Sequence, residues 1–122
     1  MKIFIDSANI SELKKAYSTG LVSGVTTNPS LIAKEGMQFE KLVNEILRIF
    51  TKPMDIINFE SVSTEAGGMI EDGIKLSRIS KNVVVKVPLT EQGLLACQEL
   101  ARKNIRVNVT LCFSSAQALL AA

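Results

Sequence analysis

A continuous run of β-branched residues with one lysine in it constrains the fold of this chain more than any other segment. Residues 83–88 read Val-Val-Val-Lys-Val-Pro. A run that is apolar at nearly every position, and not at alternate positions only, is typical of a strand covered on both faces in a parallel sheet. The segment therefore predicts a parallel α/β fold and places Lys86 among apolar neighbours.

Lys86 has two interpretations in such a strand. Its charged form is disfavoured away from water, and a long side chain usually reaches solvent at the end of a strand. Alternatively, the amine lies in a partly dry pocket, loses its proton near neutral pH and attacks a carbonyl as a nucleophile. The run by itself favours the first interpretation, so the second needs support from the rest of the chain.

Segments of strand and helix character alternate along the whole chain. Strands are predicted over 2–6, 24–27, 56–60, 83–88 and 105–111. Helices are predicted over 10–20, 29–36 and 38–50, from a cap at Ser63 or Thr64 to Ile74, from a cap at Thr90 to Asn104, and over 114–122. Five strand–helix units in alternation imply a parallel sheet with right-handed crossovers.

Two architectures fit five such units. One is an open five-stranded, doubly wound sheet of the flavodoxin type, which 122 residues would complete. The other is the first five units of an eight-stranded (β/α)8 barrel of the TIM type, which would need roughly twice the length. In both architectures the functional residues gather at the carboxyl ends of the strands.

Signals for helix starts are clear at two places, whereas the last helix has no signal for its end. Asn28 is a favoured capping residue, and Pro29 follows at the first helical position, where its missing N–H costs nothing. Ser114 and Gln117 form a capping-box pair. No glycine, proline or basic residue follows Leu120. We therefore expect the chain, one domain over 1–122, to be truncated within this helix.

Composition excludes several classes of function. The net charge is +2, with 14 basic and 12 acidic residues interspersed, which gives no electrostatic footprint for nucleic acid or an anionic membrane. Asp6 interrupts the first apolar run before a signal peptide could form, and no run approaches the ~20 residues of a membrane span. We expect a cytoplasmic protein without a membrane or nucleic-acid partner.

The reactive side chains available are few. The sequence has no histidine, which removes the usual base of a catalytic triad and the commonest metal ligand. Cys97 and Cys112 match no ligand spacing, and we expect both to be reduced and mostly buried. Chemistry without a metal or a cofactor would have to use carboxylates, amides, hydroxyls and lysine.

Each predicted strand carries a polar residue near its carboxyl end. These residues are Asp6; Thr26, Thr27 and Asn28; Asn58 and Glu60; Lys86; and Asn108 and Thr110. The period of a strand places Asn58 with Glu60 on one face, and Asn108 with Thr110 on one face.

A parallel barrel would aim these groups at a common point. Alternatively, each residue reaches water or caps a helix, which suits Asn28 and, less well, Asp6. For Lys86 and Glu60 a function is favoured, because a buried lysine and carboxylate are retained when they are paired or used.

Four motifs resemble those of a known family. Val-Thr-Thr-Asn-Pro-Ser at 25–30, Val-Val-Lys-Val-Pro at 84–88 and Asn-Val-Thr-Leu-Cys-Phe-Ser at 108–114 resemble the signatures of transaldolase. Phe-Ile-Asp-Ser-Ala at 4–8 is similar to the smaller, bacterial-type branch, which is shared with fructose-6-phosphate aldolase. The motifs occur in the family's order and span the chain. The resemblance implies the N-terminal part of a (β/α)8 barrel, and it selects the barrel over the flavodoxin-type sheet.

The resemblance also implies roles for the catalytic residues. Lys86 would form a Schiff base with the ketone of a ketose phosphate. Asp6 would be the acid–base residue that takes a proton as the C–C bond breaks. Glu60, with Thr110, would hold a catalytic water.

The same resemblance implies the substrates and the reaction. Asn28 and Asn108, with Thr27, would bind the dihydroxyacetone fragment. The reaction would transfer this fragment between sugar phosphates in the pentose phosphate pathway, without a cofactor or metal, in an enzyme that we expect to be a homo-oligomer. Glu60 favours transaldolase, because the aldolase branch carries glutamine at the matching place.

Some expectations and alternatives accompany this interpretation. The residues that grip the substrate phosphate would lie beyond Ala122, so we expect the chain alone to be weakly active or inactive unless a second chain closes the sheet. An inactive remnant would have the same side chains. A signalling receiver domain also has five such units, but it needs an aspartate where this chain has Glu60, an acid pair where it has Asp6 alone, and a lysine after the fifth strand.

Overall fold

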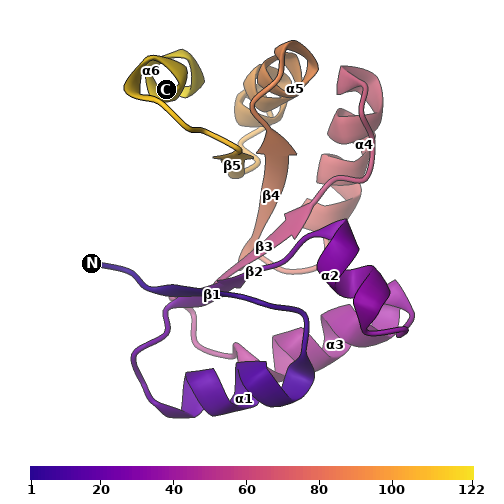
Figure 1. The fold of residues 1–122 in the computed structure, drawn as a ribbon. Coiled ribbons are helices and arrows are strands. Elements are labelled where there is room, and N and C mark those ends of the chain that lie inside the picture. Colours follow the sequence, from indigo (N-terminus) through magenta and orange to yellow (C-terminus); the bar gives the residue numbers. More distant parts are fainter. The chain divides into compact units, whose positions relative to one another are not determined.

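The computed structural model describes residues 1–122, which form two compact units, 1–59 and 60–122. Five strands alternate with helices (Figure 1). The strands are β1 (Phe4–Asp6), β2 (Gly24–Thr26), β3 (Ile56–Glu60), β4 (Val83–Pro88) and β5 (Val107–Thr110). The helices are α1 (Ile10–Ser18), α2 (Pro29–Lys34), α3 (Phe39–Ile49), α4 (Ala66–Ser77), α5 (Glu91–Arg102) and α6 (Ser115–Ala121). The alternation confirms the predicted α/β class.

The strand order in the first unit distinguishes the two predicted architectures. β2 pairs in parallel with β1 and with β3, so it lies between them. In a doubly wound sheet of the flavodoxin type, the first strand lies between the second and the third. The observed order excludes that arrangement and agrees with the first βα units of a TIM barrel, in which each strand lies beside its predecessor.

The core of the first unit forms between its strands and the helices α1 and α3, which pack side by side (Figure 1). Leu13 of α1, Leu42 and Ile46 of α3, and Val25 and Ile57 of the strands have no exposed surface. These helices alternate apolar and polar positions at helical spacing, and the buried strand residues face that apolar side. The packing fixes the strand ends that carry polar residues.

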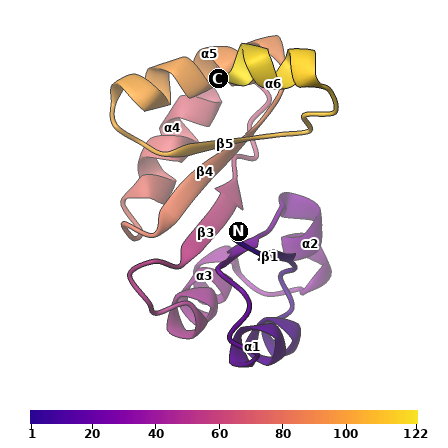
Figure 2. The same cartoon turned by 90° about the vertical axis from the view of Figure 1, so that its left-hand side faces the viewer.

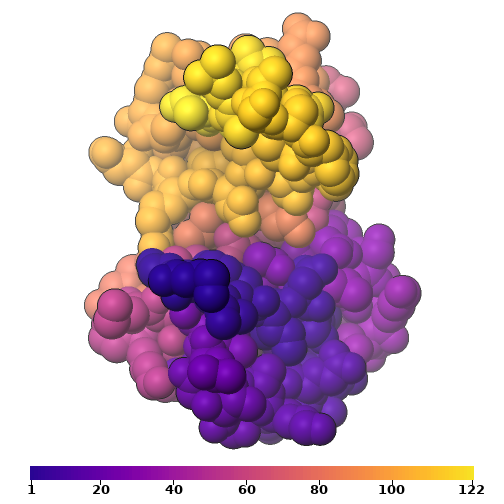
Figure 3. All heavy atoms as spheres, turned by 60° about the vertical axis from the view of Figure 1, so that its left-hand side comes forward, coloured from indigo at the N-terminus to yellow at the C-terminus, as the bar shows by residue number.

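In the second unit, β4 pairs in parallel with β5, and both strands contact α5 while β4 also contacts α4. Figure 2 shows these helices along the two strands. All five residues from Val83 to Val87 are buried, which confirms the prediction from the valine run. The shorter α6 lies at the surface of this unit in Figure 3, where it is coloured yellow.

The predicted helix starts were partly correct. Asn28, Thr90 and Ser114 each accept a hydrogen bond from the backbone N–H three residues on, as caps do. The capping box is incomplete, because Gln117 Oε1 accepts from the N–H of Phe113 and not from that of the cap residue.

The prediction that Ser63 or Thr64 caps the fourth helix was wrong. Glu65 occupies the cap position without a side-chain hydrogen bond. Instead, Gln92 of α5 accepts from the N–H of Ala66 at 3.1 Å. A side chain of a neighbouring helix thus accepts from a backbone N–H at the start of α4, and a local sequence pattern could not indicate this partner.

Both cysteines are free, and Cys97 is half-buried. Cys112 is exposed, so the expectation of burial was wrong for it, because it follows β5 in a segment that no other element covers. No helix combines the length and the apolar character that crossing a membrane requires.

Gly93 on α5 provides a first test of the packing in the second unit. A Cβ atom at this position would overlap the backbone carbonyl oxygen of Pro88, whereas one at Gly67 on α4 would meet open space. We expect Gly93→Ala to lower the free energy of unfolding by about 1–3 kcal/mol through overpacking. Gly67→Ala should leave it unchanged or raise it by up to about 1 kcal/mol through helix propensity. Urea denaturation checks both, and equal effects would contradict the close approach.

Tyr17 gives a second test, in the first unit. Its hydroxyl donates to Asp55 Oδ2 at 2.8 Å, and burial, followed by this carboxylate, raises the pKa of the phenol. A raised pKa in the folded state adds stability that is fully present below the unfolded value of about 10 and is lost as the pH rises through the folded value.

We therefore expect the free energy of unfolding to fall more steeply above about pH 10 in the wild type than in Tyr17→Phe. The variant should already be less stable at neutral pH, by about 1 kcal/mol, because the hydrogen bond is missing. Urea denaturation across this pH range measures the difference. Tyr17 is the single tyrosine of the chain, so the ultraviolet absorbance of phenolate reports its ionisation directly. A midpoint at or below the ordinary value would contradict the prediction.

Candidate active site

An ion pair in the second unit joins the end of β3 to β4. Lys86 Nζ lies 3.1 Å from Glu60 Oε2, and the two side chains are 9% and 18% exposed. The lysine is thus enclosed by its surroundings and does not extend into solvent. A pair with this little exposure is held together more strongly than a surface pair, because solvent screens it less.

Backbone hydrogen bonds bring other polar residues beside Lys86. Residues paired across a parallel sheet share a face, and Lys86 is paired with Asn108 of β5. Thr110 lies two residues further along β5, so it is on the same face. The N–H of Ser61 donates to the carbonyl oxygen of Lys86 at 3.1 Å, which places Glu60 at the level of the lysine. The second unit therefore groups Lys86, Glu60, Asn108 and Thr110.

The first unit has its own group of polar residues at the strand ends. Asp6, Thr26 and Asn58 lie in register across β1, β2 and β3. Thr26 Oγ1 donates to Asp6 Oδ1 at 2.7 Å, and Asn58 Nδ2 donates to the carbonyl oxygen of Val25 at 3.0 Å. Asp6 is exposed and does not cap α1, since Asn9 does so. Its carboxylate therefore stands at the end of β1, oriented by Thr26.

Thr26 is among the polar residues predicted at the strand ends, but the sequence assigned it no role in the site. It is the last residue of β2, as Asp6 is the last residue of β1. The register of the two strand ends could have indicated that role, because a hydroxyl in register with a carboxylate can donate to it.

Asn28 and Thr27 are placed differently from the other predicted site residues. Asn28 Oδ1 accepts from the N–H of Leu31 at 2.9 Å. The cap of α2 therefore uses the amide oxygen of Asn28 and does not use its amide nitrogen. Thr27 has no exposed surface, and its N–H donates to the carbonyl oxygen of Asn58. This bond continues the strand, so the Thr27 side chain points away from the face of Thr26.

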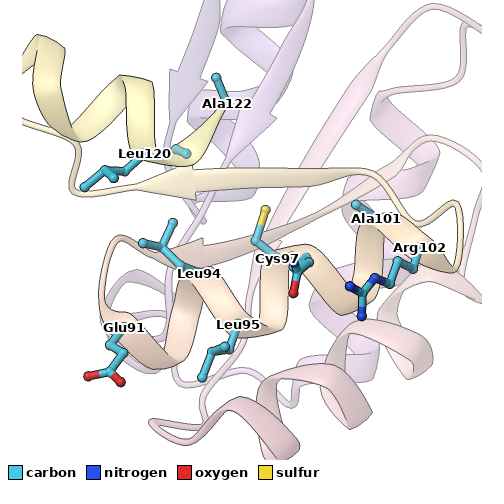
Figure 4. Close-up of a pocket in the computed structure, with 10 residues that line it drawn as sticks. Glu91, Leu94, Leu95, Cys97, Ala101, Arg102, Leu120 and Ala122 are labelled. Carbon is cyan, nitrogen blue, oxygen red and sulfur yellow. The ribbon is translucent and has the colours of Figure 1, made fainter.

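A cleft between α5 and α6 is separate from these residues (Figure 4). Leu94 and Cys97 of α5 and Leu120 of α6 line it, with Glu91 and Arg102 at its borders. Burial raises the pKa of the Cys97 thiol, which makes the thiol less reactive. The lining contains none of the polar residues at the strand ends, so this cleft is not the candidate active site.

Comparison with known proteins identifies relatives of the whole chain. The model of the Transaldolase/Fructose-6-phosphate aldolase family matches residues 3–122. A probable transaldolase of Caldicellulosiruptor saccharolyticus is 57% identical over 122 residues, which are 55% of its length. Probable transaldolases of Pelotomaculum thermopropionicum and Geobacter sulfurreducens are 55% and 52% identical over the whole chain, which covers 55% and 56% of their lengths. The chain thus spans little more than half the length of these relatives.

The Lys86–Glu60 pair can be tested through stability. Glu60→Gln leaves the lysine charge without its partner, and we expect a loss of about 1–3 kcal/mol in the free energy of unfolding, less than for a fully buried pair. Lys86→Met should cost a similar amount. In the double variant the two losses should not add, which leaves a coupling of about 1–3 kcal/mol.

Urea denaturation of the four proteins measures this coupling. The matched control is Glu99→Gln, which breaks the pair of Glu99 and Arg102 on α5. Their side chains are 41% and 64% exposed, so we expect a loss of no more than about 1 kcal/mol. Additive losses at Lys86 and Glu60 would show that the enclosed contact is energetically unimportant.

Proposed function

Because the chain belongs to the Transaldolase/Fructose-6-phosphate aldolase family, we propose that Lys86 is the nucleophile of a transaldolase-type reaction. In this reaction Lys86 forms a Schiff base with a ketose phosphate and passes a dihydroxyacetone unit to an aldose phosphate, within the pentose phosphate pathway. The observation that carries the proposal is the enclosed ion pair of Lys86 and Glu60, with Asn108 in register beside the lysine.

The first step makes the imine, and it needs proton transfers at the lysine. The neutral amine attacks the ketone carbon: the C–N bond forms, and the electron pair of the C=O bond moves to oxygen, which takes a proton. Water then leaves and the iminium ion forms. Glu60, at 3.1 Å from Lys86 Nζ, is close enough to accept a proton from the ammonium group and to return one to the departing hydroxyl. Thr110, on the face of the lysine, would help to hold the water used in these transfers.

The second step breaks the C–C bond. Asp6 takes the proton of the hydroxyl next to the bond, an aldehyde departs, and the electron pair moves into the iminium ion to give an enamine. The positive charge of the imine stabilises the electron pair as it develops. The enamine then attacks the acceptor aldehyde, and water releases the new ketose from Lys86. The role of Asp6 rests on the motif at 4–8, and its orientation by Thr26 suits a carboxylate that must stay in place.

The dihydroxyacetone unit carries hydroxyl groups, which amides can bind. Asn108 lies beside Lys86 and would hold this unit next to the imine. Asn28, whose amide nitrogen is not used by its cap, is proposed for the same unit on the basis of the motif at 25–30. Thr27 belongs to the same motif, but its buried side chain points to the opposite face, so we propose that it supports Asn28 from behind and does not contact the substrate. These assignments use no cofactor or metal, in keeping with the residue types.

A second candidate is the lyase reaction of fructose-6-phosphate aldolase, in which the enamine takes a proton and free dihydroxyacetone leaves. The presence of Glu60 favours transfer, since the aldolase branch resembles this chain but carries glutamine at the matching place. The relatives named probable transaldolase support the same choice. An aldose phosphate acceptor separates the two: transfer yields a longer ketose phosphate, and the lyase yields free dihydroxyacetone.

Borohydride trapping tests the proposed nucleophile. With fructose 6-phosphate, we expect reduction to fix an adduct on Lys86, below full stoichiometry for the chain alone, located by peptide mass spectrometry. Lys86→Met should abolish the adduct. Lys81→Met should not, because Lys81 is an exposed residue before β4. Glu60→Gln should slow adduct formation by about 10²-fold or more through loss of acid–base catalysis. Adducts spread equally over exposed lysines, or one that survives in Lys86→Met, would overturn the proposal.

A further inference from the structure

We propose that Ser61 and Asp72 are positioning residues for Glu60, which hold the tip of β3 so that the Glu60 carboxylate faces Lys86. The proposal deepens the function proposed above and rests on it for the catalytic use of Glu60. Neither Ser61 nor Asp72 belongs to the polar residues at the strand ends that the sequence analysis identified. All the residues of this arrangement lie in the second unit.

Ser61 directly follows Glu60 and makes three hydrogen bonds. Its N–H donates to the carbonyl oxygen of Lys86 at 3.1 Å. Its hydroxyl donates to Asp72 Oδ2 at 2.7 Å and accepts from the N–H of Ser63 at 3.2 Å. The residue is 7% exposed. One serine therefore ties the strand end to β4, to α4 and to its own loop.

The period of a strand explains how these bonds act on Glu60. Successive side chains point to opposite faces of a sheet. Glu60 points to the face of Lys86, so Ser61 points to the other face, where α4 carries Asp72. The bond between Ser61 and Asp72 thus fixes the backbone from behind the site. A glutamate side chain has several rotatable bonds, and a fixed backbone reduces the positions that its carboxylate can reach.

The loop between β3 and α4 is held at two more points. A Cβ atom at Gly68 of α4 would overlap Ser63 Oγ, so the glycine allows the loop to approach the helix closely. Further along, Gln92 of α5 accepts from the N–H of Ala66. These contacts remove the freedom that a loop after a strand usually has. They support a loop built to keep one geometry.

Packing alone would not require a carboxylate and a hydroxyl between a strand and a helix. Asp72 is half-buried, and removing a carboxylate from water costs free energy that a small apolar pair would not cost. The hydrogen bond between Ser61 and Asp72 fixes a definite geometry instead, because a hydrogen bond to a charged acceptor is stronger and more specific in geometry than an apolar contact. A fixed geometry is useful at the end of β3, because Glu60 there carries the carboxylate proposed for catalysis.

Competitive labelling with acetic anhydride tests the proposal without any sugar. It measures the rate at which the Lys86 amine is acetylated at each pH. Glu60 Oε2 lies 3.1 Å from this amine, and Asn108, in register beside it, is neutral. Glu60→Gln should raise the rate at which Lys86 is acetylated, because the amine loses the carboxylate that holds it. If Ser61 positions Glu60, Ser61→Ala should move the labelling profile in the same direction. Asp72→Ala should do likewise, whereas Asp72→Asn keeps an acceptor for the hydroxyl and should stay close to the wild type.

Ser77→Ala is the matched control. Ser77 lies on α4, is half-buried, and bonds only its own helix, through the carbonyl oxygen of Ile74 at 3.0 Å. It should leave the labelling profile of Lys86 unchanged. Circular dichroism establishes that each variant is folded, and Asp72→Ala replaces Ser61→Ala if the latter does not fold.

Trapping with fructose 6-phosphate adds a second measurement. We expect Ser61→Ala to slow adduct formation on Lys86 by about 10- to 100-fold through misplacement of Glu60, at an unchanged half-saturating sugar concentration. A Ser61→Ala protein with lower thermal stability but a wild-type labelling profile would overturn the positioning role. An absent adduct in the wild type would overturn the proposed function, while a shifted profile would still support the role of Ser61 in holding the ion pair.

Discussion

The ion pair of Lys86 and Glu60 is the contact around which the candidate active site of the second unit is arranged. Both side chains are largely shielded from solvent, so each charge would be costly without the other. The strand β4 is buried over five successive residues, and the lysine is among them. An amine in this position is shielded from water and adjacent to a carboxylate, which suits the proposed imine chemistry.

The residues proposed for catalysis and the residues that hold them in place lie on opposite faces of the sheet. One face of β4 and β5 carries Lys86, Asn108 and Thr110, and the end of β3 adds Glu60. The other side of the β3 tip carries Ser61 and its bond to Asp72. Because neighbouring residues of a strand point to opposite faces, a contact in the helix layer can set the position of a group on the other face. The same division occurs in the first unit, where Thr26 orients Asp6 while Thr27 is buried on the opposite side.

Local sequence patterns predicted the limits of several helices and strands well, but they predicted the contacts between these elements poorly. The limits of β3 and β4 agree with the predicted ones, as do the caps Asn28 and Thr90, because these depend on residues close together in the chain. The start of α4 was mispredicted because its partner, Gln92, comes from another helix. Cys112 was expected to be buried, but composition says nothing of whether a neighbouring element covers a residue.

The sequence by itself determined the α/β class, the strand with its lysine, the polar residues at the strand ends and, through four motifs, the family. Each of these can be read from the period of a strand or helix or from a contiguous motif. Only the tertiary structure decided that β2 lies between β1 and β3, that Lys86 meets Glu60, and that Ser61 bonds Asp72. The period of a strand tells which residues share a face, but which strand lies beside it depends on contacts between segments far apart in the chain.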